Sequence, residues 1–318
     1  MSTERDTVVI ALGGNAILQP GQVGTFEEQL VNVDAAARRI ARLVPAGWQV
    51  VMTHGNGPQV GNLLIQNEAA SAQIPPMPMD VCGAESQGQI GYLFAQSLDN
   101  HLRRLKLDVP VCAMLTQVEV SPTDPAFSAP SKPVGPFYSE ARGKELALEK
   151  GVVMREDAGR GWRRVVASPA PLRIVEEDAI RALMDAGFVV VSVGGGGIPV
   201  VADADGNLTG VAAVIDKDLA CSLLATVIGA ELLMITTSVE KVALRFGTPE
   251  QEWVDRMTLS EAKAYLAEGT HFAEGSMGPK IRAVVGFLER GGGTAIITDP
   301  ENVERALAGE TGTTIVGD

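Results

Sequence analysis

Short, continuous apolar runs alternate along the chain with longer segments in which apolar residues recur every three or four positions. The short runs predict buried strands and the periodic segments predict amphipathic helices. The predicted strands cover residues 8–12, 50–53, 109–115, 188–193, 232–236 and 294–298. The predicted helices cover residues 26–45, 59–72, 87–105, 179–186, 219–228, 260–268 and 279–290. This alternation predicts an α/β fold with a mostly parallel sheet covered by helices on both faces.

The stretch from about residue 120 to residue 172 departs from this alternation. It holds seven prolines and a polar run over residues 155–164. Long irregular insertions are commonly functional, and ligands of open α/β sheets bind at the carboxyl ends of the strands. We therefore expect a single domain over residues 1–318, with an inserted subdomain at about 120–172 that lies over the site. A long surface excursion is the alternative.

Composition and charge narrow the class of partner. With 318 residues, 46% of them hydrophobic, the chain can bury a large core. A net charge of −13 without a basic cluster argues against nucleic acid as a partner. The three cysteines and three histidines show no spacing typical of disulfides or metal sites. The polar start at Met1–Asp6 and the glycine-broken apolar region 188–201 predict a cytoplasmic protein without a membrane segment.

Three glycine-rich turns directly follow predicted strands. They are Gly13-Gly14-Asn15, Gly55-Asn56-Gly57 and Gly194-Gly195-Gly196-Gly197. Bare backbone amides at the start of a helix bind anions, phosphate above all. Tight turns without a ligand are the alternative for the first two segments. For the third, a ligand is favoured and the close approach of another chain segment is the alternative. The sequence has no P-loop, and residues 55–61 are one residue too long for a dinucleotide-binding G-x-G-x-x-G motif.

Three lysines occupy positions where an anion would stabilise them. Lys217 lies between Asp216 and Asp218 at a predicted helix start, where a cation opposes the helix dipole. Lys280 follows another glycine turn before a helix, and Lys132 lies on a proline-framed tip of the inserted stretch. Each lysine alone is more typical of solvated surface, and either aspartate is a plausible N-cap. Together the lysines favour a site for a transferring phosphoryl group, with an aspartate to hold them.

The motifs, in this order, resemble those of the carbamate kinases of the amino acid kinase family. The segments Lys-Pro-Val-Gly-Pro-Phe and Glu-Asp-Ala-Gly-Arg-Gly-Trp-Arg distinguish carbamate kinases from acetylglutamate and aspartate kinases. The resemblance extends over nearly the whole length. The segments that carry it are 11–17, 53–62, 132–137, 156–163, 194–200, 214–218 and 275–280.

The resemblance implies the amino acid kinase fold, a three-layer αβα sandwich with a mostly parallel open sheet and a protruding subdomain, in a homodimer. It implies reversible phosphoryl transfer between carbamoyl phosphate with MgADP and carbamate with MgATP, linked to arginine or carbamoyl phosphate catabolism. Mg²⁺ would be held through nucleotide phosphates rather than by dedicated protein ligands.

The resemblance also implies roles for individual residues. Lys217 and Lys280 would neutralise nucleotide phosphates, Asp218 or Asp216 would orient these lysines, and Lys132 would reach in from the inserted subdomain. The residues expected around carbamate and the transferring phosphoryl group are Gly13, Gly14, Asn15, Gly55, Asn56, Gly57, Gly195 and Gly196. The residues expected around the nucleotide are Thr237, Ser238, Gly275, Ser276 and Met277.

Three positions depart from the family pattern. Ser238 and Glu240 stand in a segment that usually reads close to Thr-Gly-Val-Asp, and Glu274 replaces a proline. The expected phosphate contacts are all retained. Two alternatives stay open on the same fold: a sensor without catalysis and a kinase of another small carboxylic acid. A nicotinamide-dependent dehydrogenase is disfavoured by the missing fingerprint.

Overall fold

The computed structural model describes residues 5–157, 159, 161–273 and 275–318. Residues 1–4 of the polar start, Ala158 and Arg160 of the motif at 156–163, and the departing Glu274 lie outside the described residues.

A mixed sheet of eight strands forms the centre of the described part of the chain, in the order β15-β17-β16-β12-β1-β2-β9-β3. All neighbours pair in parallel except β16 and β17, which are antiparallel. Parallel strands are buried on both faces, which explains their continuous apolar runs. The strands are β1 (Thr7–Leu12), β2 (Gln49–His54), β3 (Val111–Ala113), β9 (Val189–Val191), β12 (Leu232–Thr236), β15 (Arg256–Thr258), β16 (Thr294–Thr298) and β17 (Thr313–Val316).

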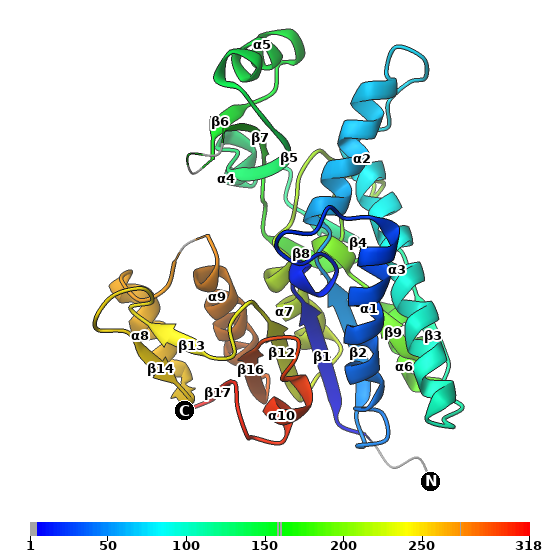
Figure 1. Cartoon of the computed structure of the whole chain (residues 1–318), viewed down its shortest axis with the longest axis vertical. Coiled ribbons are helices and arrows are strands. Elements are labelled where there is room, and N and C mark those ends of the chain that lie inside the picture. Colours follow the sequence, from blue (N-terminus) through cyan, green and yellow to red (C-terminus); the bar gives the residue numbers. More distant parts are fainter. Residues whose placement is uncertain (1–4, 158, 160, 274) are drawn as a thin grey trace.

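Helices cover both faces of this sheet, and alternate residues of β1 separate two cores (Figure 1). Val8 and Ile10 pack with α1 and α3, whereas Val9 and Ala11 point to the core that contains α7 and α9. The predicted three-layer αβα fold with a mostly parallel sheet is therefore confirmed. The main helices are α1 (Phe26–Ala41), α2 (Gly57–Ala70), α3 (Met79–Arg104), α6 (Glu177–Asp185), α7 (Lys217–Val227), α8 (Leu259–Glu268), α9 (Met277–Glu289) and α10 (Val303–Leu307).

The largest difference from the predicted elements concerns α3. Its predicted start at residue 87 is wrong, because the helix begins at Met79, directly after Pro78. The predicted helix 26–45 ends at Ala41, followed by turns, and it starts at a capping box between Thr25 and Glu28. The strands predicted over 232–236 and 294–298 have the predicted bounds.

The inserted stretch folds into strands and helices of its own. A lobe of β5 (Lys132–Tyr138), β6 (Met154–Glu156), β7 (Trp162–Val166) and α5 (Glu140–Lys150) stands above the main sheet beside α2 (Figure 1). It is joined to the rest by a four-stranded sheet in the order β11-β10-β4-β8. The remaining elements are β4 (Gln117–Val120), α4 (Pro125–Ser128), β8 (Pro171–Ile174), β10 (Ile198–Ala202), β11 (Leu208–Gly210), β13 (Val242–Leu244), β14 (Glu252–Val254) and the 3₁₀ turns η1 (Gly14–Ala16) and η2 (Gly194–Gly196).

The turn after β9 requires glycine for two reasons. Gly196 has φ +96°, and a Cβ atom there would lie 2.5 Å from the carbonyl oxygen of Ile215. We expect Gly196→Ala to lower the free energy of unfolding by about 3 kcal/mol, because backbone cannot yield as a flexible side chain does. Gly206→Ala is the matched control, since φ is +85° but no atom lies within 4 Å; its expected loss is about 1 kcal/mol. Urea unfolding measures both, and equal losses would contradict the close approach.

Candidate active site

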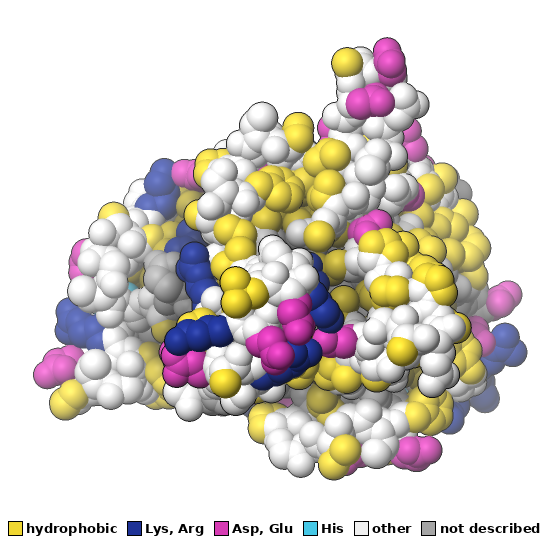
Figure 2. All heavy atoms as spheres, turned by 90° about the horizontal axis from the view of Figure 1, so that it is seen from above, with side chains coloured by type: hydrophobic (Ala, Val, Ile, Leu, Met, Phe, Trp, Pro, Cys, Tyr) yellow, Lys and Arg dark blue, Asp and Glu magenta, His cyan; other side chains and the backbone are white. Residues whose placement is uncertain are grey.

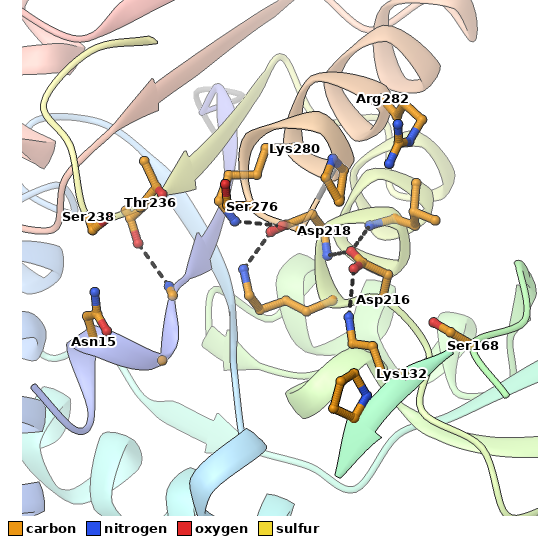
Figure 3. Close-up of a pocket in the computed structure, with 18 of the residues that line it drawn as sticks. Asn15, Lys132, Ser168, Asp216, Asp218, Thr236, Ser238, Ser276, Lys280 and Arg282 are labelled. Atoms are coloured by element: carbon orange, nitrogen blue, oxygen red, sulfur yellow. Dashed lines mark hydrogen bonds and ion pairs between the residues drawn. The ribbon is translucent and has the colours of Figure 1, made fainter. Parts of the chain in front are cut away.

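A cavity of about 870 Å³ lies where the carboxyl ends of β1 and β12 meet the N-termini of α7 and α9 (Figure 3). The start of β5 closes it from the lobe. Seen from above, the surface is hollowed between the lobe and the part that carries α8 and α9, with basic side chains along the hollow (Figure 2). The cavity is lined by Gly13, Gly14, Asn15, Ser131, Lys132, Pro133, Ser168, Asp216, Lys217, Asp218, Leu219, Thr236, Thr237, Ser238, Gly275, Ser276, Pro279, Lys280, Arg282 and Pro300.

The three lysines singled out in the sequence converge in this cavity. Lys217 Nζ lies 2.5 Å from Asp218 Oδ1, and Lys280 Nζ lies 2.8 Å from Asp218 Oδ2. Lys132 Nζ reaches in from the lobe to within 3.0 Å of Asp216 Oδ2 (Figure 3). Lys132 and Lys280 are 148 positions apart in the chain, yet both line the same cavity.

Asp216 has two structural roles that the sequence left as alternatives. It is the N-cap of α7, where Oδ1 accepts hydrogen bonds from the backbone N–H groups of Asp218 and Leu219. Its second oxygen, Oδ2, accepts from Lys132. The same carboxylate therefore starts the helix and holds the lysine of the lobe.

Burial and charge determine the protonation of the inner cluster. Asp218 is 6% exposed, and burial alone would raise its pKa, but Lys217 and Lys280 lower the pKa to about 2. Burial alone would lower the pKa of Lys217, yet Asp218 holds that pKa above its ordinary value. Burial and the neighbouring charge of Lys217 lower the pKa of Lys280. Two ammonium groups share one carboxylate, so the cluster carries an excess positive charge suited to an anion.

The glycine turns at the ends of β1 and β2 lie against each other. Gly13 N–H donates to Thr236 Oγ1 at 3.0 Å, which ties the first turn to the end of β12. A Cβ atom on Gly55 would lie 3.2 Å from the backbone nitrogen of Gly14. A side chain on Gly55 would force the two turns apart by a few tenths of an ångström, so glycine favours their close approach and keeps side-chain bulk away from the amide of Gly14 at the cavity wall.

The third turn contacts the second one. A Cβ atom on Gly195 would clash with the side-chain amide of Asn56, whose Nδ2 donates to Ser86 Oγ at 2.8 Å. Gly55, Asn56, Gly57, Gly195 and Gly196 do not line the cavity among the described residues; they lie behind its wall at Gly14. The structure therefore brings all three turns together, but only the first turn, Gly13–Asn15, lines the cavity.

The expected nucleotide residues divide in the same way. Thr237, Ser238, Gly275 and Ser276 line the cavity, whereas Met277 is the first residue of α9 and does not. The departing Glu240 does not line it either; its carboxylate accepts from Thr311 Oγ1 and lies 3.7 Å from Arg305 Nη1.

Ser131, Ser168 and Arg282 line the cavity but were not predicted from the sequence. Ser131 and Arg282 lie one and two positions from predicted lysines, so their proximity in the chain was a usable signal. Ser168 follows β7 of the inserted stretch and lacked any signal in the sequence.

The carboxylates of the cavity are already engaged. Both oxygens of Asp218 accept from lysines, and those of Asp216 accept from Lys132 and the start of α7. Within the described ranges no group of three or more His, Cys, Asp or Glu residues is arranged to hold a metal ion. A divalent cation here would therefore depend on oxygens supplied by a ligand.

None of the described helices is both long and apolar enough to cross a membrane.

We expect the folded protein to lose stability in acid because of His54, which is buried at the end of β2. Burial lowers its pKa to about 4; the hydrogen bond to the Gly55 carbonyl opposes this shift, and the charge of Lys217 adds to it. The unfolded chain therefore binds a proton near pH 6.5, whereas the folded chain binds it only near pH 4. Stability is lost as the pH falls through this window, by up to about 3 kcal/mol. Urea unfolding from pH 7 to 4 measures the loss.

His54→Asn is the control for this prediction, because an amide can still donate to the Gly55 carbonyl but does not titrate. We expect its stability curve to lack the His54 contribution between pH 6.5 and 4. If the free energy of unfolding of the unmodified protein and of His54→Asn fell equally between pH 7 and 4, the loss could not be assigned to His54.

Comparison with known proteins assigns the chain to a family. The model of the amino acid kinase family matches residues 6–299. The chain belongs to the amino acid kinase family, a family of phosphotransferase enzymes, as predicted.

Within that family the chain resembles carbamate kinases along its whole length. It is 52% identical to the carbamate kinase of Thermococcus kodakarensis over 97% of this chain and 98% of that protein. It is 50% identical to the carbamate kinase of Pyrococcus furiosus with the same coverage. The structure of the carbamate kinase from Giardia lamblia bound to AMP-PNP matches with a TM-score of 0.93 and 46% identity, over 100% of both chains.

Proposed function

We propose that the chain is a carbamate kinase that converts carbamoyl phosphate and ADP to carbamate and ATP, reversibly. The observation that carries this proposal is the convergence of Lys132, Lys217 and Lys280 around one cavity next to the turn at Gly13–Asn15. Phosphoryl transfer depends mainly on positioning and charge neutralisation, and this cavity offers cations and backbone amides.

The two inner lysines and Asp218 have defined tasks in this reaction. In the direction of ATP synthesis, an oxygen of the β-phosphate of ADP forms a bond to phosphorus. The bond from phosphorus to the carbamoyl oxygen breaks, and its electron pair leaves with carbamate. Lys217 and Lys280 stabilise the charge on the phosphate oxygens, and Asp218 keeps both ammonium groups in place. Carbamate is already an anion, so the reverse reaction needs no strong general base.

The nucleotide fits the side of the cavity formed by β12 and α9. Thr237, Ser238, Gly275 and Ser276 line this side, and Met277 follows at the start of the helix. Mg²⁺ would be held through the nucleotide phosphates and would neutralise their charge, because the carboxylates of Asp216 and Asp218 are engaged by protein donors. The relative bound to AMP-PNP supports an adenine nucleotide as the ligand.

A coupled assay tests the proposal. ATP formed from ADP and carbamoyl phosphate with Mg²⁺ drives hexokinase and glucose-6-phosphate dehydrogenase, and NADPH absorbance reports the rate. We expect ATP well above the enzyme-free background. ATP at background would favour a sensor on the same fold, and faster transfer with N-acetylglutamyl phosphate would favour a kinase of another acid.

The other expected properties belong to the same proposal. We propose a cytoplasmic homodimer that acts in arginine or carbamoyl phosphate catabolism, with an inserted subdomain at about 120–172. Light scattering coupled to size-exclusion chromatography tests the dimer, and a mass of about 33 kDa rather than twice that value would exclude it.

A further inference from the structure

A second cavity, of about 380 Å³, lies between the lobe, the C-terminal half of α2 and the start of α3. Strand β5 packs against α2 and connects the two cavities. Its first residue, Lys132, lines the large cavity, whereas Val134, Gly135, Pro136 and Tyr138 line the second one. A molecule in the second cavity would therefore contact the lobe and the α2–α3 pair at once.

The second cavity contains a guanidinium group that lacks a partner. Among the described residues, no side chain forms a hydrogen bond or ion pair with Arg164, although this side chain is half-buried on β7. Of the described residues that line the cavity, Glu68 alone carries a carboxylate, and this carboxylate is already engaged. Lys150 Nζ lies 2.7 Å from its Oε1, and Tyr138 Oη donates to its Oε2 at 3.1 Å. A partly desolvated cation that has no hydrogen bond or ion pair of its own in the described part of the chain, with the nearby Glu68 carboxylate already shared with Lys150, favours the binding of an anion.

The charges of the cavity select the kind of anion. Arg164 and Lys150 carry two positive charges and Glu68 carries one negative charge, which leaves an excess of one. A single negative charge neutralises this excess, whereas a phosphate dianion would exceed it. A planar guanidinium binds a carboxylate through two parallel hydrogen bonds. Burial lowers the pKa of Arg164, and the charges of Tyr138 and Glu68 oppose this shift.

The rest of the lining is largely apolar. Leu64, Met79, Val134 and Pro136 form the walls around the charged group. Apolar side chains also gather over the upper ends of α2 and α3 beside the lobe (Figure 2), where Ile74 and Met77 are exposed. We propose that this cavity binds a small monocarboxylate with a short apolar chain, whose carboxylate pairs with Arg164.

Isothermal titration calorimetry with valerate tests the site directly. We expect one valerate per chain, and Arg164→Gln should weaken binding at least tenfold, because a charge-assisted pair is lost. Arg155→Gln is the matched control: Arg155 lies on the neighbouring strand β6, is exposed, and does not line the cavity. Equal binding by the two variants would overturn the proposal.

A second variant tests the site without changing any charged group. Ala212 lines the cavity and is exposed, so Ala212→Phe should fill the space and weaken valerate binding without changing any titratable group. Binding of inorganic phosphate through Arg164 in place of valerate would overturn the choice of a monocarboxylate. Unchanged valerate binding by the filled variant would place the ligand elsewhere and overturn the site.

One more variant separates this site from the proposed kinase cavity. Lys217 lines only the large cavity of the two, so Lys217→Ala should bind valerate as tightly as the unmodified protein. Loss of valerate binding in that variant would show that the acid occupies the large cavity and would overturn the proposal. None of these measurements requires kinase activity, so a negative coupled assay would leave the binding result intact.

The consequence for catalysis rests on the proposed function. Tyr138 of β5 and Lys150 of α5 already bond to Glu68 of α2. An acid bound by Arg164 would add a link from β7 to α2, and because β7 pairs with β5 it would hold β5 and Lys132 in place. Hydrogen exchange of residues 132–138 should slow on adding valerate to the unmodified protein, and not in Arg164→Gln. Unchanged exchange in the unmodified protein would overturn this link.

Discussion

Replacing Lys217 by alanine is expected to lower kcat for ATP formation by roughly three orders of magnitude while the fold persists. Its ammonium group lies in the cavity, 2.5 Å from Asp218, and stabilises charge on the transferring phosphoryl group. The fold should persist because Asp218 keeps Lys280 as a partner at 2.8 Å. The coupled assay gives kcat, and urea unfolding reports stability.

Lys263→Ala is the control for this experiment. Lys263 is an exposed lysine on α8 that pairs with Glu289 and does not line the cavity. Its removal changes the net charge by the same amount and should leave kcat unchanged. Activity of Lys217→Ala within a few-fold of the unmodified enzyme would refute the assigned role.

Replacing Asp218 by asparagine is expected to reduce both stability and activity. Two buried ammonium groups would then face a neutral amide, and breaking a buried ion pair on one side costs about 3 kcal/mol. Because the phosphates of a nucleotide can replace the lost charge, ATP with Mg²⁺ should restore much of that stability. Thermal unfolding with and without nucleotide measures both effects.

Asp216→Asn provides the comparison for that loss. Lys132, its partner, is 38% exposed, so water can solvate the released ammonium group, and asparagine remains a good N-cap. We expect a smaller loss of stability and little recovery with nucleotide. Equal stability of Asp218→Asn and the unmodified protein would show that the inner cluster does not depend on this carboxylate.

Local signals in the sequence were sufficient for most of the main fold. Buried strands such as β12 and β16 are short apolar runs, and their bounds follow from hydrophobicity alone. The start of α3 was missed because its first turns mix polar and apolar residues without a clear period. The lobe strands alternate with prolines and charged residues, so no pattern indicated how β5, β6 and β7 pair.

For the site, the residue types were predictable but the contacts were not. Lys217 and Lys280 stood out because a cation opposes the dipole at a helix start, and Lys132 stood out because it lies on a proline-framed tip. Their partners depend on tertiary structure: Asp218 binds two of them and Asp216 binds the third. The unpaired Arg164 of the second cavity could not be found from the sequence, because it lies beside another arginine in a strongly charged segment.

The order of strands has a consequence for synthesis of the protein. Strand β1 is made first, yet one of its two neighbours, β12, is more than 200 positions later, with Val8 opposite Leu232. A chain still growing on the ribosome therefore exposes one long edge of its earliest strand, which is prone to wrong pairing. The cavity wall formed by the hydrogen bond between Gly13 and Thr236 can close only after the chain has been made as far as Thr236. Completion of catalytic competence should thus be a late, post-translational event.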